Sequence, residues 1–286
     1  MKSKRGLKNN GMPDTIQKLG KLFRLFEKPG EPSFTVNELE LAQEIQANLL
    51  PKSFPLNQKI EVGALYKASK YIGGDFYDVI QIDDRKIAFV IGDVSGKSLH
   101  AALFMAQCLT LLKVFIKMDL NILKIIEKTN QMLFELVKTD MFATVFIGIY
   151  DTHYHQLSYV NAGHNPPLLL RTSVKIPAKD HHPLTMLTAE GIALNCIANM
   201  ILEEKRIQLY EGDILLLYTD GLIDASNEFE KEFGEAKLKG LITELRDLPA
   251  QQMTQKILEH IEGYSKASKT TNDDMAALVI KFKEEK

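Results

Sequence analysis

Hydrophobic and polar residues form two kinds of pattern along this chain, and the first kind predicts β-strands. Beyond Lys59, short apolar runs are bounded by glycine, proline, asparagine or aspartate, a pattern typical of strands. The predicted strands cover residues 61–68, 75–82, 86–91, 142–150, 156–161, 168–171, 205–210, 214–218 and 275–282. Short turns at 83–84, 151–155 and 211–213 join consecutive strands and predict hairpins, whereas residues 172–200 are expected to be irregular.

In the second pattern, apolar residues recur at helical spacing, which predicts helices. The predicted helices cover residues 14–28, 35–50, 99–117, 120–138, 234–246 and 249–264. Thr35 can cap the second of them, and Glu38 three residues later completes a capping box. Hairpins outnumber strand–helix–strand units, so we expect an α+β protein with mostly antiparallel sheets.

These patterns divide the chain into three parts. Residues 1–35 form a basic, partly disordered and partly helical segment, which ends at a proline- and glycine-containing break at 29–32. Residues 36–58 form a helical linker, and residues 59–286 form one larger domain. The 14–28 helix is read either as a partner or membrane-surface helix or as a helix packed within the protein. We favour packing, because its polar face carries both charge signs.

Composition narrows the class of protein. The chain has 286 residues, 45% of them hydrophobic, which is enough for a sizeable core. A net charge of −2 and a pI of about 6.4 give no sign of a nucleic-acid footprint. Cys108 and Cys196 have no metal or redox spacing. With no signal-peptide core and no apolar run of about 18 residues expected, we predict a soluble, cytoplasmic protein without a membrane span.

Four aspartates stand at the ends of apolar, strand-like runs, beside glycine or a second acidic residue. They are Asp75, Asp93, Asp220 and Asp273. Two carboxylates about 4 Å apart repel by roughly 4 kcal/mol at an effective dielectric near 20. A fold that gathers them needs positive charge, and Mg²⁺ or Mn²⁺ prefer carboxylate and water oxygens. The pattern therefore favours metal-assisted hydrolysis, especially at phosphate.

Each motif taken alone also has a purely structural interpretation. A lone Asp93 or Asp220 is more often a turn or N-cap residue. Only the recurrence of strand-end aspartates favours a functional role. The segment 92–98 imitates a phosphate-binding P-loop, but its first glycine comes one residue too late. His164 could be a general acid or a metal ligand. We favour the alternative, a structural histidine.

Six stretches in the same order carry a resemblance to a known family. Residues 73–78, 92–97, 142–151, 161–170, 215–225 and 273–281 resemble the sigma-factor-regulating branch of bacterial metal-dependent, type 2C-like serine/threonine protein phosphatases. That branch includes sporulation stage II protein E, and the resemblance spans about residues 36–282. Residues 41–51 look like the helical linker that precedes its catalytic domain. The resemblance implies a four-layer αββα sandwich of two mostly antiparallel sheets flanked by helices.

The resemblance also implies roles for particular residues. Asp93 matches an aspartate that bridges two Mn²⁺ or Mg²⁺ ions, and the Val94 carbonyl matches the backbone ligand after it. Asp220 and Asp273 match ligands of one metal site, and Asp75 matches an acidic residue close to the ions. Asp93 and Asp220 are thus the expected catalytic residues. The metals would activate water, so no nucleophilic serine or cysteine is required.

The implied substrate is phosphoserine or phosphothreonine in a protein, expected to be a phosphorylated anti-sigma-factor antagonist in a partner-switching pathway. The alternatives are a catalytically inactive phosphoprotein-binding regulator and a two-metal phosphodiesterase. Residues 36–50 are expected to form a homodimer contact, as the linker of this family often does. Ser98 and Asn195 depart from the family pattern, because both stand where glycine is common.

Overall fold

The computed structural model describes residues 36–55, 59–118, 120–137, 140–172, 183–266, 268 and 273–283. The basic segment 1–35, with the helix expected at 14–28, lies outside the described residues. The helical linker begins at α2 (Val36–Leu49), close to the predicted position. Most other predicted elements are present, with ends shifted by a few residues.

Within the described residues, ten strands form two five-stranded sheets, and neighbouring strands in each sheet pair antiparallel. The first sheet runs in the order β1 (Ile60–Lys67), β10 (Met275–Phe282), β9 (Ile214–Tyr218), β6 (Leu168–Leu170) and β7 (Leu184–Met186). The second runs in the order β2 (Phe76–Gln81), β3 (Lys86–Val94), β4 (Ala143–Asp151), β5 (Gln156–Ala162) and β8 (Glu204–Gln208).

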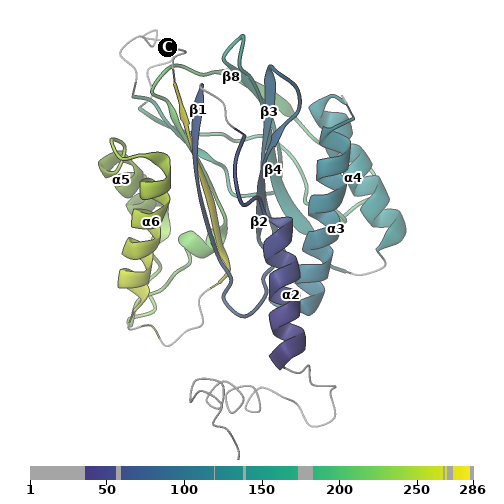
Figure 1. The fold of residues 1–286 in the computed structure, drawn as a ribbon, viewed down its shortest axis with the longest axis horizontal. Helices are drawn as coiled ribbons and strands as arrows, with labels where there is room; N and C mark the ends of the chain where they lie inside the picture. Colours follow the sequence, from purple (N-terminus) through teal and green to yellow (C-terminus); the bar gives the residue numbers. More distant parts are fainter. Residues whose placement is uncertain are drawn as a thin grey trace, which may run out of the picture.

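Helices cover both outer faces of the paired sheets (Figure 1). On one side lie α5 (Gly234–Glu244) and α6 (Ala250–Ser265), with α6 packed on β1 and β10. On the other lie α3 (Leu99–Ile116) and α4 (Ile122–Leu136), with α3 packed on β2 and β3. Strand β10 also contacts β2 and β3 across the middle of the molecule. The four-layer αββα sandwich is therefore confirmed.

The predicted hairpin across residues 211–213 is wrong. Strand β8 pairs with β5 at the edge of one sheet, whereas β9 lies between β10 and β6 in the other. Their compositions explain the separation. The sequence of β9 is apolar throughout and fully buried, which suits a central strand, whereas β8 carries charged residues and is partly exposed. The short strand β7 also lies within the stretch expected to be irregular.

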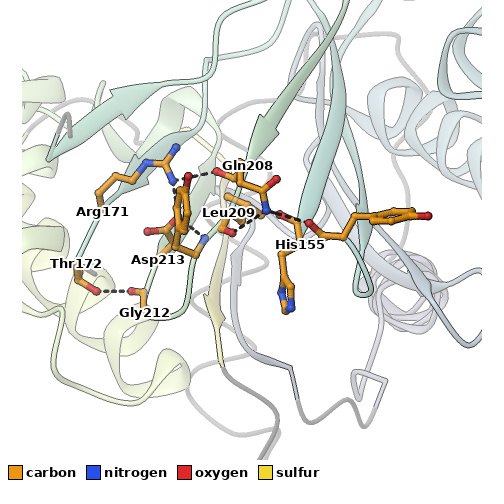
Figure 2. Close-up of polar contacts among 9 residues, drawn as sticks. His155, Arg171, Thr172, Gln208, Leu209, Gly212 and Asp213 are labelled. Atoms are coloured by element: carbon orange, nitrogen blue, oxygen red, sulfur yellow. Dashed lines mark hydrogen bonds and ion pairs between the residues drawn. The ribbon is translucent and has the colours of Figure 1, made fainter. Parts of the chain in front are cut away.

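A buried ion pair fixes the crossover from β8 to β9 (Figure 2). Arg171, just after β6, contacts Asp213 with 2.8 Å between Nη1 and Oδ2, and both side chains are almost fully buried. The same guanidinium nitrogen donates to the Gln208 carbonyl at 3.0 Å. Burial raises the pKa of Asp213 to about 6, although Arg171 opposes that shift. The pair thus joins the end of β8 to the start of β9.

Helix α3 corrects the expectation that no stretch reaches membrane-spanning length and hydropathy. Its 18 residues have a mean hydropathy of 1.8, so by length and composition alone it could cross a membrane. Its buried face includes Phe104, Met105, Leu109 and Leu112, which belong to the main hydrophobic core. A core helix of a folded domain passes the same test, so this finding is weak evidence for a span.

One face of helix α2 docks on the αββα sandwich. Leu39 and Gln46 are buried, and the Gln46 amide exchanges two hydrogen bonds with the Gly73 backbone, at 2.6 and 3.0 Å. Lys113 of α3 also donates to the carbonyl of Leu49 at 2.7 Å. The opposite face keeps Leu41 and Ile45 exposed. The linker helix is therefore tied to the loop that precedes β2.

Candidate metal centre

The four predicted aspartates lie at strand ends contributed by both sheets. Asp75 directly precedes β2, and Asp93 is the next-to-last residue of β3. Because Phe76 pairs with Gly92, the register places Asp75 opposite Asp93. In the other sheet, Asp220 comes two residues after β9, and Asp273 lies two residues before β10, which pairs with β9.

The carboxyl groups of Asp75 and Asp93 interact directly. Asp75 is only 1% exposed. Burial, followed by the charge of Asp93, raises its pKa well above the usual range. Burial and then the charge of Asp220 raise the pKa of Asp93 to about 7. The two carboxyl groups therefore lie close enough for the charge of Asp93 to raise the pKa of Asp75.

Asp220 belongs to the same electrostatic cluster. It opens the 3₁₀ turn η2 (Asp220–Leu222) that follows β9. Burial and then the charge of Asp273 raise the pKa of Asp220. Asp224, which the sequence analysis did not single out, also has a raised pKa, caused first by burial and then by Glu232 and Asp273. The charge effects between Asp93 and Asp220 and between Asp220 and Asp273 place carboxylates of the two sheets within electrostatic reach of one another.

Two residues that the sequence analysis left unassigned hold this cluster in place. Thr219 is buried, and its hydroxyl donates to Asp75 Oδ2 at 2.6 Å while accepting from the Ala276 amide at 2.9 Å. Asp274 is buried, and its carboxylate accepts from the amides of Ser69 at 2.7 Å and Gly74 at 2.8 Å. Of the adjacent residues Asp273 and Asp274, it is therefore Asp274 that holds the loop before β2 in place.

Close backbone approach explains two glycines beside the aspartates. A Cβ on Gly221 would lie 1.9 Å from the Asp274 carbonyl oxygen, so no other residue fits there without a shift. A Cβ on Gly74 would lie 2.8 Å from the carbonyl oxygen of Val94. Glycine at these points lets neighbouring strand ends within each sheet come close together, β9 to β10 in one sheet and β2 to β3 in the other.

The donor set fits a hard divalent cation. It consists of carboxylates from both sheets and a backbone carbonyl near Gly74, the oxygen chemistry that Mg²⁺ and Mn²⁺ prefer. Burial and then the neighbouring carboxylates raise the pKa values of Asp75, Asp93 and Asp220, so a bound cation would stabilise their charged forms. Within the described ranges, however, no three His, Cys, Asp or Glu side chains are already arranged around one point as metal ligands. The assignment of Asp75, Asp93, Val94, Asp220 and Asp273 as ligands stays a prediction.

His164 has the contacts of a structural histidine. Its ring is buried between the two sheets, with Nδ1 2.9 Å from the Thr144 hydroxyl and Nε2 3.2 Å from the Tyr218 carbonyl. Since a carbonyl only accepts, Nε2 carries the proton and Nδ1 accepts from Thr144. Burial lowers the pKa of His164 to about 4, so the ring is neutral near pH 7. Thr144 pairs with Asp93 across β3 and β4, so this histidine supports the strand that carries Asp93.

The two departures from the family pattern have different structural consequences. Asn195 adopts a φ of 66°, in the left-handed region that asparagine tolerates better than most residues. Its side chain donates to the Met141 carbonyl at 2.8 Å, and its amide donates to Asn130 Oδ1 at 2.8 Å. Ser98 is the N-cap residue of α3 in an extended conformation that does not require glycine. Both positions are accommodated without a change of fold.

A separate hollow lies away from the aspartates. Its volume is about 670 Å³, and it lies between α4 and residues 198–200. Asn130, Phe134 and Met200 line it, and none of the candidate ligands does. The candidate chemistry is therefore located at the strand ends and not in this hollow.

The two antiparallel sheets with helices on both outer faces have the type 2C phosphatase fold. The SiaA-PP2C domain of Pseudomonas aeruginosa has a TM-score of 0.74, with 18% identity over 95% of this chain and 100% of that one. RsbX, solved in complex with magnesium, has a TM-score of 0.57, with 17% identity over 80% of this chain and 98% of that one. At these identities the likeness shows the fold alone.

The family profile described as Stage II sporulation protein E (SpoIIE) matches residues 83–283, and the chain belongs to this family. The chain is 30% identical to Protein IcfG of Synechocystis over 79% of its own length and 39% of that protein. It is 25% identical to the phosphoserine phosphatase RsbU of Bacillus subtilis over 86% of its length and 70% of that protein. The chain thus spans well under half of one relative and about two thirds of the other.

Proposed function

We propose that this protein is a metal-dependent serine/threonine protein phosphatase. The observation that carries the proposal is the cluster of Asp75, Asp93, Asp220 and Asp273, which strand ends of both sheets bring together in a chain of the SpoIIE family. Two Mn²⁺ or Mg²⁺ ions are the cofactors we propose, with the four carboxylates and the Val94 carbonyl as ligands. Two such ions neutralise phosphoryl oxygens and lower the pKa of water.

The protein's own groups would orient this chemistry. Asp93 lies opposite Asp75 in its own sheet and within reach of the charge of Asp220 in the other, which supports the proposal that it would be a ligand shared by the ions. Thr219 fixes one oxygen of Asp75 through its hydroxyl, so that carboxylate cannot rotate freely. Asp274 and Gly221 keep the strand ends in contact. The site is thus rigid on the side of the sheets and partly exposed at Asp93, Asp220 and Asp273.

We further propose a phosphorylated protein of the anti-sigma-factor antagonist type as the substrate, in a partner-switching pathway. Support comes from family membership and from the relative RsbU, whose name is phosphoserine phosphatase. The free thiols Cys108 and Cys196 agree with a reducing cytoplasm as the place of action. Partners that are nucleic acids do not fit the net charge of −2.

The activity is tested by phosphate release with added Mn²⁺ or Mg²⁺. We expect hydrolysis of p-nitrophenyl phosphate and of phosphoserine proteins, and complete loss after EDTA treatment with recovery on adding metal, because the metals activate water. A phosphodiester substrate, run beside them, should be cleaved far more slowly. Undiminished turnover in EDTA, or a preference for the diester, would contradict the proposal. Phosphoprotein binding without turnover would favour an inactive regulator.

Helix α2 is proposed to pair with the same helix of a second copy. One face docks on the domain, but Leu41 and Ile45, one turn apart, are each 57% exposed. A second copy would cover them by two-fold symmetry. Because Gln46 of this helix holds the Gly73 backbone two residues from Asp75, pairing would also affect the metal site.

We expect full-length protein to be a dimer at micromolar concentration and Ile45→Glu to be a monomer, because a charge would be buried in the pair. Light scattering with a concentration series measures both states. Gln43→Glu is the control and should stay dimeric, because Gln43 is exposed and the helical period turns it away from Leu41 and Ile45. A wild-type protein that is monomeric at high micromolar concentration would leave α2 as an intramolecular element only.

A further inference from the structure

Lys97 places a positive charge inside the carboxylate cluster. Its Nζ lies 2.6 Å from Asp273 Oδ2, in a pair whose side chains are 42% and 29% exposed. Among the ion pairs of the described residues, this is the one that involves a candidate ligand. The same ammonium also interacts with the charges of Asp220 and Asp274.

The two oxygens of Asp273 have different environments. Oδ1 accepts the amide hydrogen of Asp274 at 2.8 Å, within the chain that leads into β10. Oδ2 is the oxygen that faces Lys97. The Lys97 ammonium therefore contacts Oδ2, whereas the Asp274 amide donates to Oδ1. Oδ2 is thus the Asp273 oxygen that could otherwise bind a cation.

The turn that carries Lys97 is fixed to the neighbouring strand region. The Ser95 amide donates to the Phe142 carbonyl at 2.9 Å, and the Phe142 amide donates to the Ser95 hydroxyl at 3.1 Å. Gly96 has a φ of 97°, a conformation that reverses the chain and suits glycine. The turn that leads to Lys97 is thus anchored at Ser95, two residues after Asp93, and the long Lys97 side chain reaches Asp273 from it.

We propose that Lys97 competes with a divalent cation for Asp273 and so sets the metal affinity of the site. An ammonium and a metal ion cannot both contact Oδ2 in the same geometry, since a ligand oxygen lies about 2.0–2.1 Å from Mg²⁺. Metal binding must therefore break the ion pair and move the Lys97 side chain outward. This inference rests on the proposed function, because it needs Asp273 to bind a cation.

Isothermal titration of metal-free protein with Mn²⁺ tests the competition without any turnover. We expect Lys97→Met to bind the Asp273-dependent ion about three- to fivefold more tightly, since an exposed ion pair is worth up to about this factor. Lys97→Arg, which keeps the charge, should bind no more tightly than wild type. The Mn²⁺ concentration that gives half-maximal activity should fall with Lys97→Met in the same proportion.

Lys283→Met is the matched control. Its ammonium pairs with Glu61 at 2.6 Å, with side-chain exposures of 50% and 29%, at the far end of β10. Its Mn²⁺ affinity should equal that of wild type. Unchanged or weaker binding by Lys97→Met would overturn the role of Lys97 and leave the phosphatase proposal intact. Absence of Mn²⁺ binding in the wild type would instead overturn the metal site itself.

Discussion

Replacing Asp93 or Asp220 with asparagine is expected to lower phosphatase turnover more than about 100-fold at saturating Mn²⁺. Loss of an outer-sphere partner alone costs about 10–100-fold in metal proteins, and each of these changes would remove a charged ligand. Asp93 is also the carboxylate that couples Asp75 to Asp220, so no neighbour can replace it. Steady-state phosphate release over a series of Mn²⁺ concentrations measures the loss.

The folded state should survive both changes. In metal-free protein the carboxylates repel, and a neutral asparagine of the same shape relieves part of that repulsion. Circular dichroism and thermal melts should therefore show a native fold. Asp247→Asn, a change of the same chemistry on the exposed surface, should keep full activity. If either site variant turned over substrate like wild type, its assignment as a ligand would be wrong.

The sequence predicts the layers of this fold better than the path between them. Long apolar runs and helical spacing locate most elements, because burial on one face leaves a clear period. The crossover at 211–213 is different. A short polar turn between two strands reads as a hairpin, yet the burial of β9 on both faces and the Arg171–Asp213 pair carry the chain into the other sheet. Such long-range contacts leave no local signal.

The candidate metal site is likewise only partly predictable from the sequence. Strand-end aspartates are visible in the sequence because charge after an apolar run is unusual, and the family order of six motifs supports them. Whether Asp273 or Asp274 faces the cluster is not visible, since adjacent residues differ only in how the loop turns. Thr219 carries no motif of its own and is found only through its bond to Asp75. In the sequence, Lys97 belongs to a segment that imitates a P-loop, and nothing local predicts its contact with Asp273, which is far away along the chain.

Metal-free protein should lose stability as the pH rises from about 4 to about 7 through the Asp93 carboxyl. Its pKa is about 7 in the folded state, against about 3.9 in an unfolded chain, so the folded state holds the extra proton in this window. The resulting destabilisation is absent below about pH 4 and complete above about pH 7. His164 acts in the opposite direction, because its pKa is lowered to about 4 and the unfolded chain binds its proton below about pH 6.5.

Comparing wild type with Asp93→Asn in EDTA separates the two effects, because His164 is common to both proteins. The variant should gain about 2 kcal/mol or more in free energy of unfolding relative to wild type between pH 4 and pH 8, with about 4 kcal/mol as the limit set by a three-unit shift. Urea unfolding at each pH measures this difference. Asp84→Asn, in the exposed turn between β2 and β3, should show no such gain. Saturating Mn²⁺ should abolish the advantage of Asp93→Asn, because the cation then neutralises the carboxylates of the wild type and stabilises its folded state. A difference between the two proteins that does not change with pH would mean that Asp93 is not held near other carboxylates in solution.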